Sequence, residues 1–268
     1  MITAGIDVGM ENVKVVLLKD EKILGRGKGR SGGAKRAEAA EAALADALKE
    51  AGLKREDVEK TFATGKGKFD LPFADDCITE GITAARAAKF LEPKATTVVD
   101  AGADETVVAT LGLKKPVNEL AINEKCAAGV GTLLRIMARR FGLTMEEMSA
   151  LPPKAADGAA VNDGCAVFAE LDALSLLNNG TPVTEVAAAV TDAAAVRVCM
   201  TINDITLPAL DCVVLLGGLV KNAAFIEALK KYAKIDFVIP AEAEYAGALG
   251  AALIAAGWGG DPFFAETD

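Results

Sequence analysis

An apolar, strand-like run that ends in Asp-x-Gly occurs twice in this chain, and this repeat constrains the fold more than any other feature. The first copy ends at Asp7-Val8-Gly9 and the second at Asp100-Ala101-Gly102. Further apolar runs follow each copy, so strands are expected at 2–7, 13–18 and 22–27, and again at 96–100, 106–111 and 117–122. We therefore predict two similar α/β halves, each opening with a three-strand meander.

The rest of the chain supplies crossover elements for both halves. Helices are predicted at 34–51, 76–91, 127–141, 165–178, 183–202, 225–232 and 245–256, and short strands at 61–64, 213–216 and 236–239. Glu92-Pro93-Lys94 separates the halves, because proline stops a helix. We predict an N-terminal subdomain over 1–93 and a C-terminal subdomain over 94–268, with the last helix packing back toward the cleft between them.

The Asp-x-Gly turns are suited to holding a nucleotide. A glycine in a tight turn lets backbone groups approach a phosphate closely. Asp7 and Asp100 each end a strand, where a carboxylate can hold the water shell of Mg²⁺. A single Asp-x-Gly is a common turn, but facing turns from two halves can grip a polyphosphate between them.

A third segment offers a place for the nucleoside. The apolar run over 213–216 ends in Gly217-Gly218, which leaves an unobstructed ledge before the next helix. Asn222 follows, either as a helix cap or as a polar contact to the nucleoside. The competing interpretation is an ordinary strand-to-helix turn.

One glycine pattern resembles a dinucleotide-binding motif but does not predict one. Residues 27–32 match G-x-G-x-x-G before a helix, but the preceding strand belongs to a hairpin meander rather than a parallel βαβ unit. No acidic residue closes a second strand about twenty residues later, as a dinucleotide site requires. The sequence also contains no Walker A loop.

Composition excludes several function classes. With no histidine in 268 residues, the chain cannot build a Ser-His-Asp or Cys-His nucleophile or an imidazole metal site. The net charge of −9 argues against a nucleic-acid partner. Five cysteines, no signal-like start and no apolar stretch long enough for a bilayer predict a reduced cytoplasmic protein without a membrane partner.

Two cysteines stand in similar settings, after a polar stretch and at the start of a predicted helix. They are Cys126, within Asn123–Gly129, and Cys165, within Asn162–Phe168. A thiolate at a helix N-terminus is stabilised by the macrodipole, so the pair can hold a metal cluster or half of one shared with a partner. The alternative is that each is a small buried hydrophobe. We assign the other three cysteines to packing, placing Cys77 and Cys199 in helices and Cys212 at the start of a strand.

These segments together resemble one protein family. Asp7-Val8-Gly9, Asp100-Ala101-Gly102 and Leu216-Gly217-Gly218 look like the phosphate 1, phosphate 2 and adenosine motifs of the acetate and sugar kinase/Hsp70/actin superfamily. The segments around the two helix-start cysteines, with Ala63-Thr64-Gly65 and the Tyr245–Leu253 ending, resemble its BadF/BadG/BcrA/BcrD-type ATPase branch. That branch contains activators of 2-hydroxyacyl-CoA dehydratases and ATPase subunits of benzoyl-CoA reductases.

The resemblance implies an α/β fold of two ribonuclease H-like, actin/Hsp70-type subdomains with a nucleotide cleft between them. It implies ATP/ADP and Mg²⁺ as ligands, with Asp7 and Asp100 catalytic and with Gly9, Lys14, Gly102, Gly217, Gly218 and Asn222 binding nucleotide. It further implies a homodimer or heterodimer in which Cys126 and Cys165 give two ligands to a shared [4Fe-4S] cluster. ATP hydrolysis then drives an electron, received from a ferredoxin or flavodoxin, into a partner acyl-CoA reductase or dehydratase.

The chain departs from the family pattern in both phosphate loops. Met10-Glu11 stands where a Ser or Thr usually follows the glycine, which removes a hydroxyl and adds a negative charge unless Glu11 points away. The second loop reads Gly102-Ala103-Asp104-Glu105 rather than Gly-Gly-Gln-Asp. Two other functions stay open at this point: a small-molecule kinase of the same fold, and a nucleotide-sensing module that regulates a partner.

Overall fold

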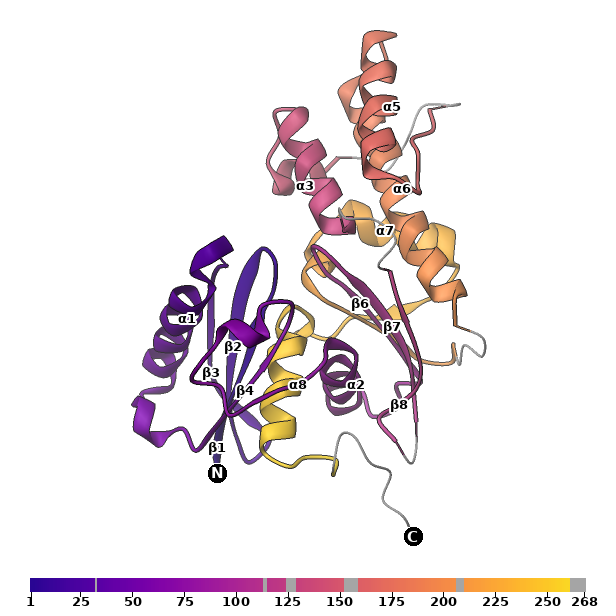
Figure 1. Cartoon of the computed structure of the whole chain (residues 1–268). Helices are drawn as coiled ribbons and strands as arrows, with labels where there is room; N and C mark the ends of the chain where they lie inside the picture. Colours follow the sequence, from indigo (N-terminus) through magenta and orange to yellow (C-terminus); the bar gives the residue numbers. More distant parts are fainter. Residues whose placement is uncertain (32, 113–114, 124–128, 152–158, 206–209, 261–268) are drawn as a thin grey trace.

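The computed structural model describes residues 1–31, 33–112, 115–123, 129–151, 159–205 and 210–260. Within them the chain forms two five-stranded mixed sheets flanked by helices (Figure 1). The first sheet has the order β3-β2-β1-β4-β5, from strands Lys22–Arg30, Asn12–Lys19, Ile2–Val8, Lys60–Thr64 and Asp76–Cys77. The second has the order β10-β9-β6-β7-β8, from strands Phe237–Val238, Val213–Leu216, Thr97–Ala101, Thr106–Leu111 and Val117–Ile122.

The two sheets repeat one topology. In the first, β1 pairs antiparallel with β2 and parallel with β4. In the second, β6 pairs antiparallel with β7 and parallel with β9. Asp7 is the last residue but one of β1, and Asp100 is the last residue but one of β6, so both aspartates occupy the same point of the repeat. The predicted duplication and α/β class are confirmed, and the antiparallel β2–β3 pairing agrees with our rejection of a dinucleotide motif over 27–32.

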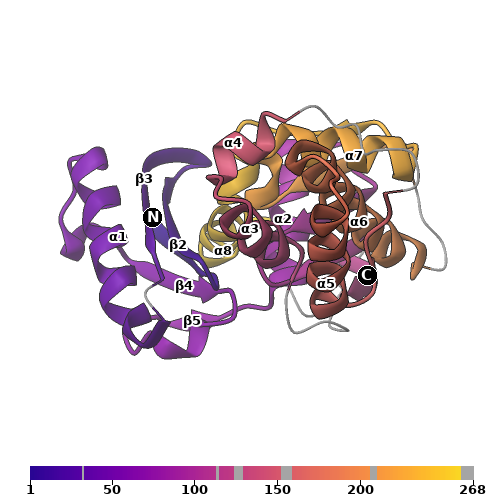
Figure 2. The ribbon, with the colours of Figure 1, turned by 90° about the horizontal axis from the view of Figure 1, so that it is seen from above.

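The helices lie around and between the sheets. They are α1 (Arg36–Ala51), α2 (Glu80–Leu91), α3 (Val130–Arg140), α4 (Met145–Ser149), α5 (Ala166–Asn178), α6 (Val183–Asn203), α7 (Ala223–Ala233) and α8 (Ala246–Ala255). Short 3-10 turns occupy Gly33–Lys35, Arg55–Asp57, Lys68–Asp70, Gly218–Lys221 and Ala243–Tyr245. Figure 2 shows α1 on the outer side of the first sheet and α3, α5 and α6 together on the other half.

Helices α2 and α8 form the layer between the two sheets (Figure 1). Their small side chains allow close packing: a Cβ on Gly5 of β1 would lie 1.9 Å from the Ala248 carbonyl oxygen, and one on Gly250 would lie 2.0 Å from that of Thr83. The alanines of α2 pack on Val98 of the second sheet. The last helix thus contacts the first sheet, and a helix from the first half contacts the second.

The helix expected over 76–91 begins later than predicted. Asp76 and Cys77 form the edge strand β5, which pairs parallel with Phe62 and Ala63 of β4, so placing Cys77 in a helix was wrong. Thr79 has an extended backbone, and α2 starts only at Glu80. Tertiary pairing with β4 overrides the local helical composition here.

Candidate functional site: a cleft between the repeated turns

A cleft of about 660 Å³ lies where the two Asp-x-Gly turns face each other. That volume is in the range of small-molecule sites. The predicted residues Asp7, Gly9, Lys14, Asp100, Gly102, Gly217, Gly218 and Asn222 all line it. The structure therefore brings the three nucleotide-like segments together from positions more than 200 residues apart.

Asp7 is enclosed by its neighbours at the floor of the cleft. Lys14, its partner in the β1–β2 register, places its Nζ 3.7 Å from Asp7 Oδ2. Gly65 and Gly247 leave room for the carboxylate: a Cβ on either would lie 2.6 Å from Oδ1 or 3.1 Å from Oδ2, respectively. Burial raises the pKa of Asp7, while Lys14 opposes the rise.

Asp100 is the more strongly perturbed carboxyl. Burial raises its pKa to about 7, and the nearby charges of Asp7, Glu105 and Glu80 act in the same direction. An excess of negative charge around a buried carboxyl is relieved by a bound cation. The two aspartates consequently fit a divalent metal ion held between the two turns.

The two glycine turns are closed in the same way. The Gly9 N–H donates to the Asn12 carbonyl at 3.1 Å, and the Gly102 N–H donates to the Glu105 carbonyl at 2.9 Å. A Cβ on Gly9 would lie 2.9 Å from the Asn12 oxygen. The glycines thus shape the turns with their own N–H groups engaged, and the absence of a side chain on them permits close approach from the cleft.

Gly217 and Gly218, where the sequence predicts a nucleoside ledge, differ in the space around them. Gly217 has φ 94°, and a Cβ there would lie 2.3 Å from the Ala101 oxygen and 2.4 Å from Asp100 Oδ1. By contrast, a Cβ on Gly218 would meet nothing within 4 Å. Gly217 is therefore required by packing, and Gly218 faces open space.

Asn222 caps a helix, which is one of the two roles that the sequence left open, and its amide nitrogen stays available for the other. Its Oδ1 caps α7 by accepting from the Phe225 N–H at 2.9 Å. The residue is only 4% exposed, and its buried Nδ2 has no hydrogen-bond partner. A buried donor without a partner is costly, so this amide fits a ligand acceptor in the cleft.

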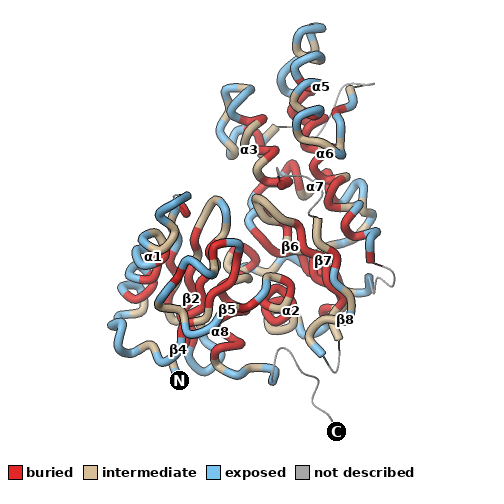
Figure 3. The backbone as a smooth tube through the Cα atoms, in the orientation of Figure 1, coloured by how far each residue is buried: buried red, intermediate tan, exposed pale blue. Residues whose placement is uncertain are grey.

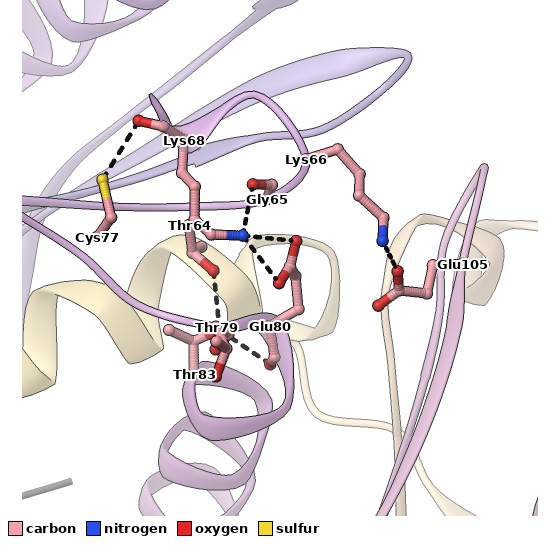
Figure 4. A network of polar contacts seen from close by, with 9 residues as sticks. All are labelled: Thr64, Gly65, Lys66, Lys68, Cys77, Thr79, Glu80, Thr83 and Glu105. Atoms are coloured by element: carbon pink, nitrogen blue, oxygen red, sulfur yellow. Dashed lines mark hydrogen bonds and ion pairs between the residues drawn. The ribbon is translucent and has the colours of Figure 1, made fainter. Parts of the chain in front are cut away.

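Sequence analysis missed half of the charged residues in the cleft. Its described lining includes eight carboxylates and four lysines: Asp7, Glu11, Glu80, Asp100, Asp104, Glu105, Glu146, Glu244, Lys14, Lys28, Lys66 and Lys221. Figure 4 shows Lys66, Glu80 and Glu105 from this set, together with Lys68, which lies outside the lining and places its Nζ 3.3 Å from both carboxylate oxygens of Glu80. No local motif predicted Glu80, Glu146, Glu244, Lys28, Lys66 or Lys221 as site residues, because only the closure of the two halves brings them together.

Glu11, the unusual residue of the first loop, is neutralised from the other half of the molecule. Its carboxylate lies 2.7 Å from the Arg135 guanidinium on α3. Its charge is thus paired, although Glu11 still lines the cleft. This pair also joins the first phosphate loop to the helix that follows the Cys126 segment.

Cys165 lies at the start of α5 as the N-cap residue. Asn162 Oδ1 accepts from the Gly164 N–H at 3.0 Å and the Cys165 N–H at 2.7 Å, and Arg197 Nε donates to the Asp163 carbonyl. These hydrogen bonds hold the loop that leads into α5, and the Cys165 thiol stays partly exposed. Cys126 falls in residues 124–128, outside the described part of the chain.

The remaining cysteines have structural surroundings. Burial raises the pKa of Cys199 in α6 to about 11 and also raises that of Cys77, whose thiol contacts the Lys68 carbonyl. Cys212 precedes β9, and its N–H donates to Thr96 Oγ1 at 3.1 Å. No group of three or more metal-binding side chains occurs within the described ranges, so Cys165 needs ligands from elsewhere to hold a cluster.

Comparison with known proteins agrees with this geometry. The chain is 36% identical over 95% of its length to the activator of lactoyl-CoA dehydratase of Anaerotignum propionicum, covering 97% of that protein. It is 32% identical over 96% of its length to a subunit of the benzoyl-CoA reductase of Thauera aromatica, covering 93% of that protein. The structure of the Clostridium difficile activator of 2-hydroxyisocaproyl-CoA dehydratase, with bound ADPNP, superposes with a TM-score of 0.84 at 29% identity, over 95% of this chain and 94% of that one. The BadF/BadG/BcrA/BcrD ATPase family model matches residues 4–255, and the chain belongs to that family.

Proposed function

We propose that this protein hydrolyses ATP to drive a low-potential electron into a partner acyl-CoA dehydratase or reductase. The observation that carries the proposal is the presence in one chain of a two-sided Asp-x-Gly cleft and a thiol at the start of a helix. The higher identity to a dehydratase activator favours a 2-hydroxyacyl-CoA dehydratase as partner.

Asp7 and Asp100 are the proposed catalytic residues. They would hold Mg²⁺ through its water shell and orient the attacking water, while the metal supplies positive charge to the phosphates. Gly9 and Gly102 would let the phosphate chain approach both turns. Lys14, whose Nζ lies 3.7 Å from Asp7 Oδ2, would balance the negative charge of the aspartates and the phosphates.

The nucleoside would lie against Gly217 and Gly218, with the unpartnered Asn222 amide donating to it. Open space over Gly218 is what supports this position. The subdomain boundaries that we propose are 1–93 and 94–268, which place one Asp-x-Gly turn in each.

Cys126 and Cys165 are the proposed ligands of a [4Fe-4S] cluster, which supplies one-electron transfer at low potential. Four thiolates are needed and one chain offers two, so a second subunit, in a homodimer or a heterodimer, would give the others. The helix behind Cys165 supports this arrangement. Val167, Phe168, Leu171 and Leu174 of α5 are 65%, 58%, 55% and 41% exposed, which gives an apolar face suited to that second subunit. Figure 3 shows much of α5 in the colour of exposed residues.

The electron donor that we propose is a ferredoxin or flavodoxin, and the compartment is the cytoplasm. The described helices include none with the length and apolarity to span a membrane. Thiols and a reduced cluster require a reducing compartment.

Iron and acid-labile sulfide, measured after purification without oxygen, test the proposal. About four of each per dimer are expected for a shared cubane. Cys165→Ser should lose the iron and keep ATP binding, whereas the matched control Cys199→Ser should keep both. Full iron content in Cys165→Ser, or no iron in the wild type after reconstitution, would contradict the cluster assignment.

A further inference from the structure

Lys66 projects into the cleft from a turn that is fixed against the first aspartate. Gly65 before it has φ 86°, and a Cβ there would lie 2.6 Å from Asp7 Oδ1. The turn is closed by the Gly67 N–H donating to the Val8 carbonyl at 2.9 Å and the Lys68 N–H donating to the Gly65 carbonyl at 3.1 Å. The starting point of the Lys66 side chain is therefore set by the end of β1.

The Lys66 ammonium reaches across the cleft to the second phosphate loop. It forms an ion pair with the Glu105 carboxylate (Figure 4). The Glu105 side chain is only 13% exposed, and its backbone carbonyl accepts the Gly102 N–H that closes the loop. The ion pair raises the pKa of Lys66 and keeps it charged. The cation thus lies between the two Asp-x-Gly turns.

Every lysine in the described cleft lining already has a carboxylate partner. Lys14 pairs with Asp7, Lys28 and Lys221 share Glu244, and Lys66 pairs with Glu105. A polyphosphate entering a cleft in which carboxylates outnumber lysines needs some of these cations to change partner.

Lys66 is the lysine best placed for such an exchange at the phosphates. Glu244, which holds Lys28 and Lys221, follows Ala243, whose carbonyl accepts the Gly217 N–H at 2.9 Å, so that group lies on the nucleoside side. Lys14 is fixed on β2 beside Asp7. Lys66 alone among the four reaches the second turn from the first half.

We propose that Lys66 binds the terminal phosphate of ATP. In the nucleotide-free cleft Lys66 is ion-paired with Glu105, and this ion pair breaks when ATP binds. The inference rests on the proposed function and names a residue pair that controls affinity at that same site. Exchange of a carboxylate for a phosphate oxygen keeps the ammonium paired throughout. Since the contact is with the terminal phosphate, ATP gains from it more than ADP.

The alternative is that the Lys66–Glu105 ion pair only holds the two halves of the protein together. Two substitutions that each break this ion pair distinguish that alternative from our proposal. Lys66→Met should weaken ATP binding about 10- to 100-fold, with a smaller effect on ADP, because a charged hydrogen bond to phosphate is lost. Glu105→Gln should instead tighten ATP binding several-fold, because the competing carboxylate is gone. A bridge that only holds the halves together predicts shifts of the same sign for both variants.

Calorimetric titration of the whole protein with Mg·ATP and Mg·ADP measures both effects. Lys66→Arg should retain most of the affinity, and Lys35→Met, which breaks the exposed 3.3 Å pair with Glu38 outside the cleft, should change nothing. Shifts of equal sign in Lys66→Met and Glu105→Gln overturn the role of Lys66 and leave the ATPase proposal standing. Failure of the wild type to bind ATP overturns both.

Discussion

Replacing Gly217 by alanine tests how packing supports the second aspartate. Gly217 has φ 94° and ψ 178°, a region essentially limited to glycine, where another residue costs about 1–3 kcal/mol. The new Cβ would also lie 2.3 Å from the Ala101 oxygen and 2.4 Å from Asp100 Oδ1. Strand β6 is paired on both sides, so relieving this overlap adds about 1–3 kcal/mol. We expect a total loss of roughly 2–6 kcal/mol, a large part of a typical domain's stability.

Gly218→Ala is the matched control, since its Cβ would meet nothing within 4 Å. Urea unfolding should show Gly218→Ala within about 0.5 kcal/mol of the wild type and Gly217→Ala far less stable. The methyl group added in Gly218→Ala would enter the ledge. This variant should therefore bind ATP more weakly than the wild type while keeping its stability. Equal unfolding midpoints for the two variants would refute the packing argument.

Three further outcomes are expected at the cleft. Because the pKa of Asp100 is raised from 3.8 to about 7, the folded protein holds a proton on this carboxyl between those two pH values, and the free energy of unfolding should fall as the pH rises through that window. Asp100→Asn should flatten this pH dependence in unfolding measured with and without Mg²⁺. An unchanged slope in the variant would show that Asp100 is not its source. Asn222→Asp should keep the oxygen that caps α7 but weaken ATP binding by about tenfold or more, since the amide donor is lost and a buried carboxylate replaces it; unchanged affinity would remove Asn222 from the site. Arg135→Met should weaken ATP binding by exposing the Glu11 charge, and adding Glu11→Gln should restore it, as titration of the double variant would show.

The strands and their turns could be predicted from sequence alone. The runs at 106–111, 117–122 and 213–216 became strands with the predicted bounds, and Gly52 ends α1 in the left-handed conformation expected of a C-cap glycine. These features depend on apolar periodicity and on glycine, which act within a few residues. The equivalence of Asp7 and Asp100 followed from the repeat for the same reason.

Other elements depended on contacts that no local pattern carries. Strand β5 exists because Asp76 and Cys77 pair with β4, and α4, which sequence analysis missed, is a single short helix capped by Thr144 and Glu147. Neither is long enough for its periodicity to stand out. Their positions were decided by the surface against which they pack.

The ion pairs of the cleft were decided by the tertiary structure. Lys66 meets Glu105, and Glu11 meets Arg135, only because the two halves close on the helices α2 and α8. The sequence determined by itself that each half ends a strand in an aspartate and a glycine, since that requires only local hydrophobicity and turn geometry. Which charges neutralise one another across the cleft was decided by folding, because electrostatic pairing depends on distance in space and not on separation along the chain.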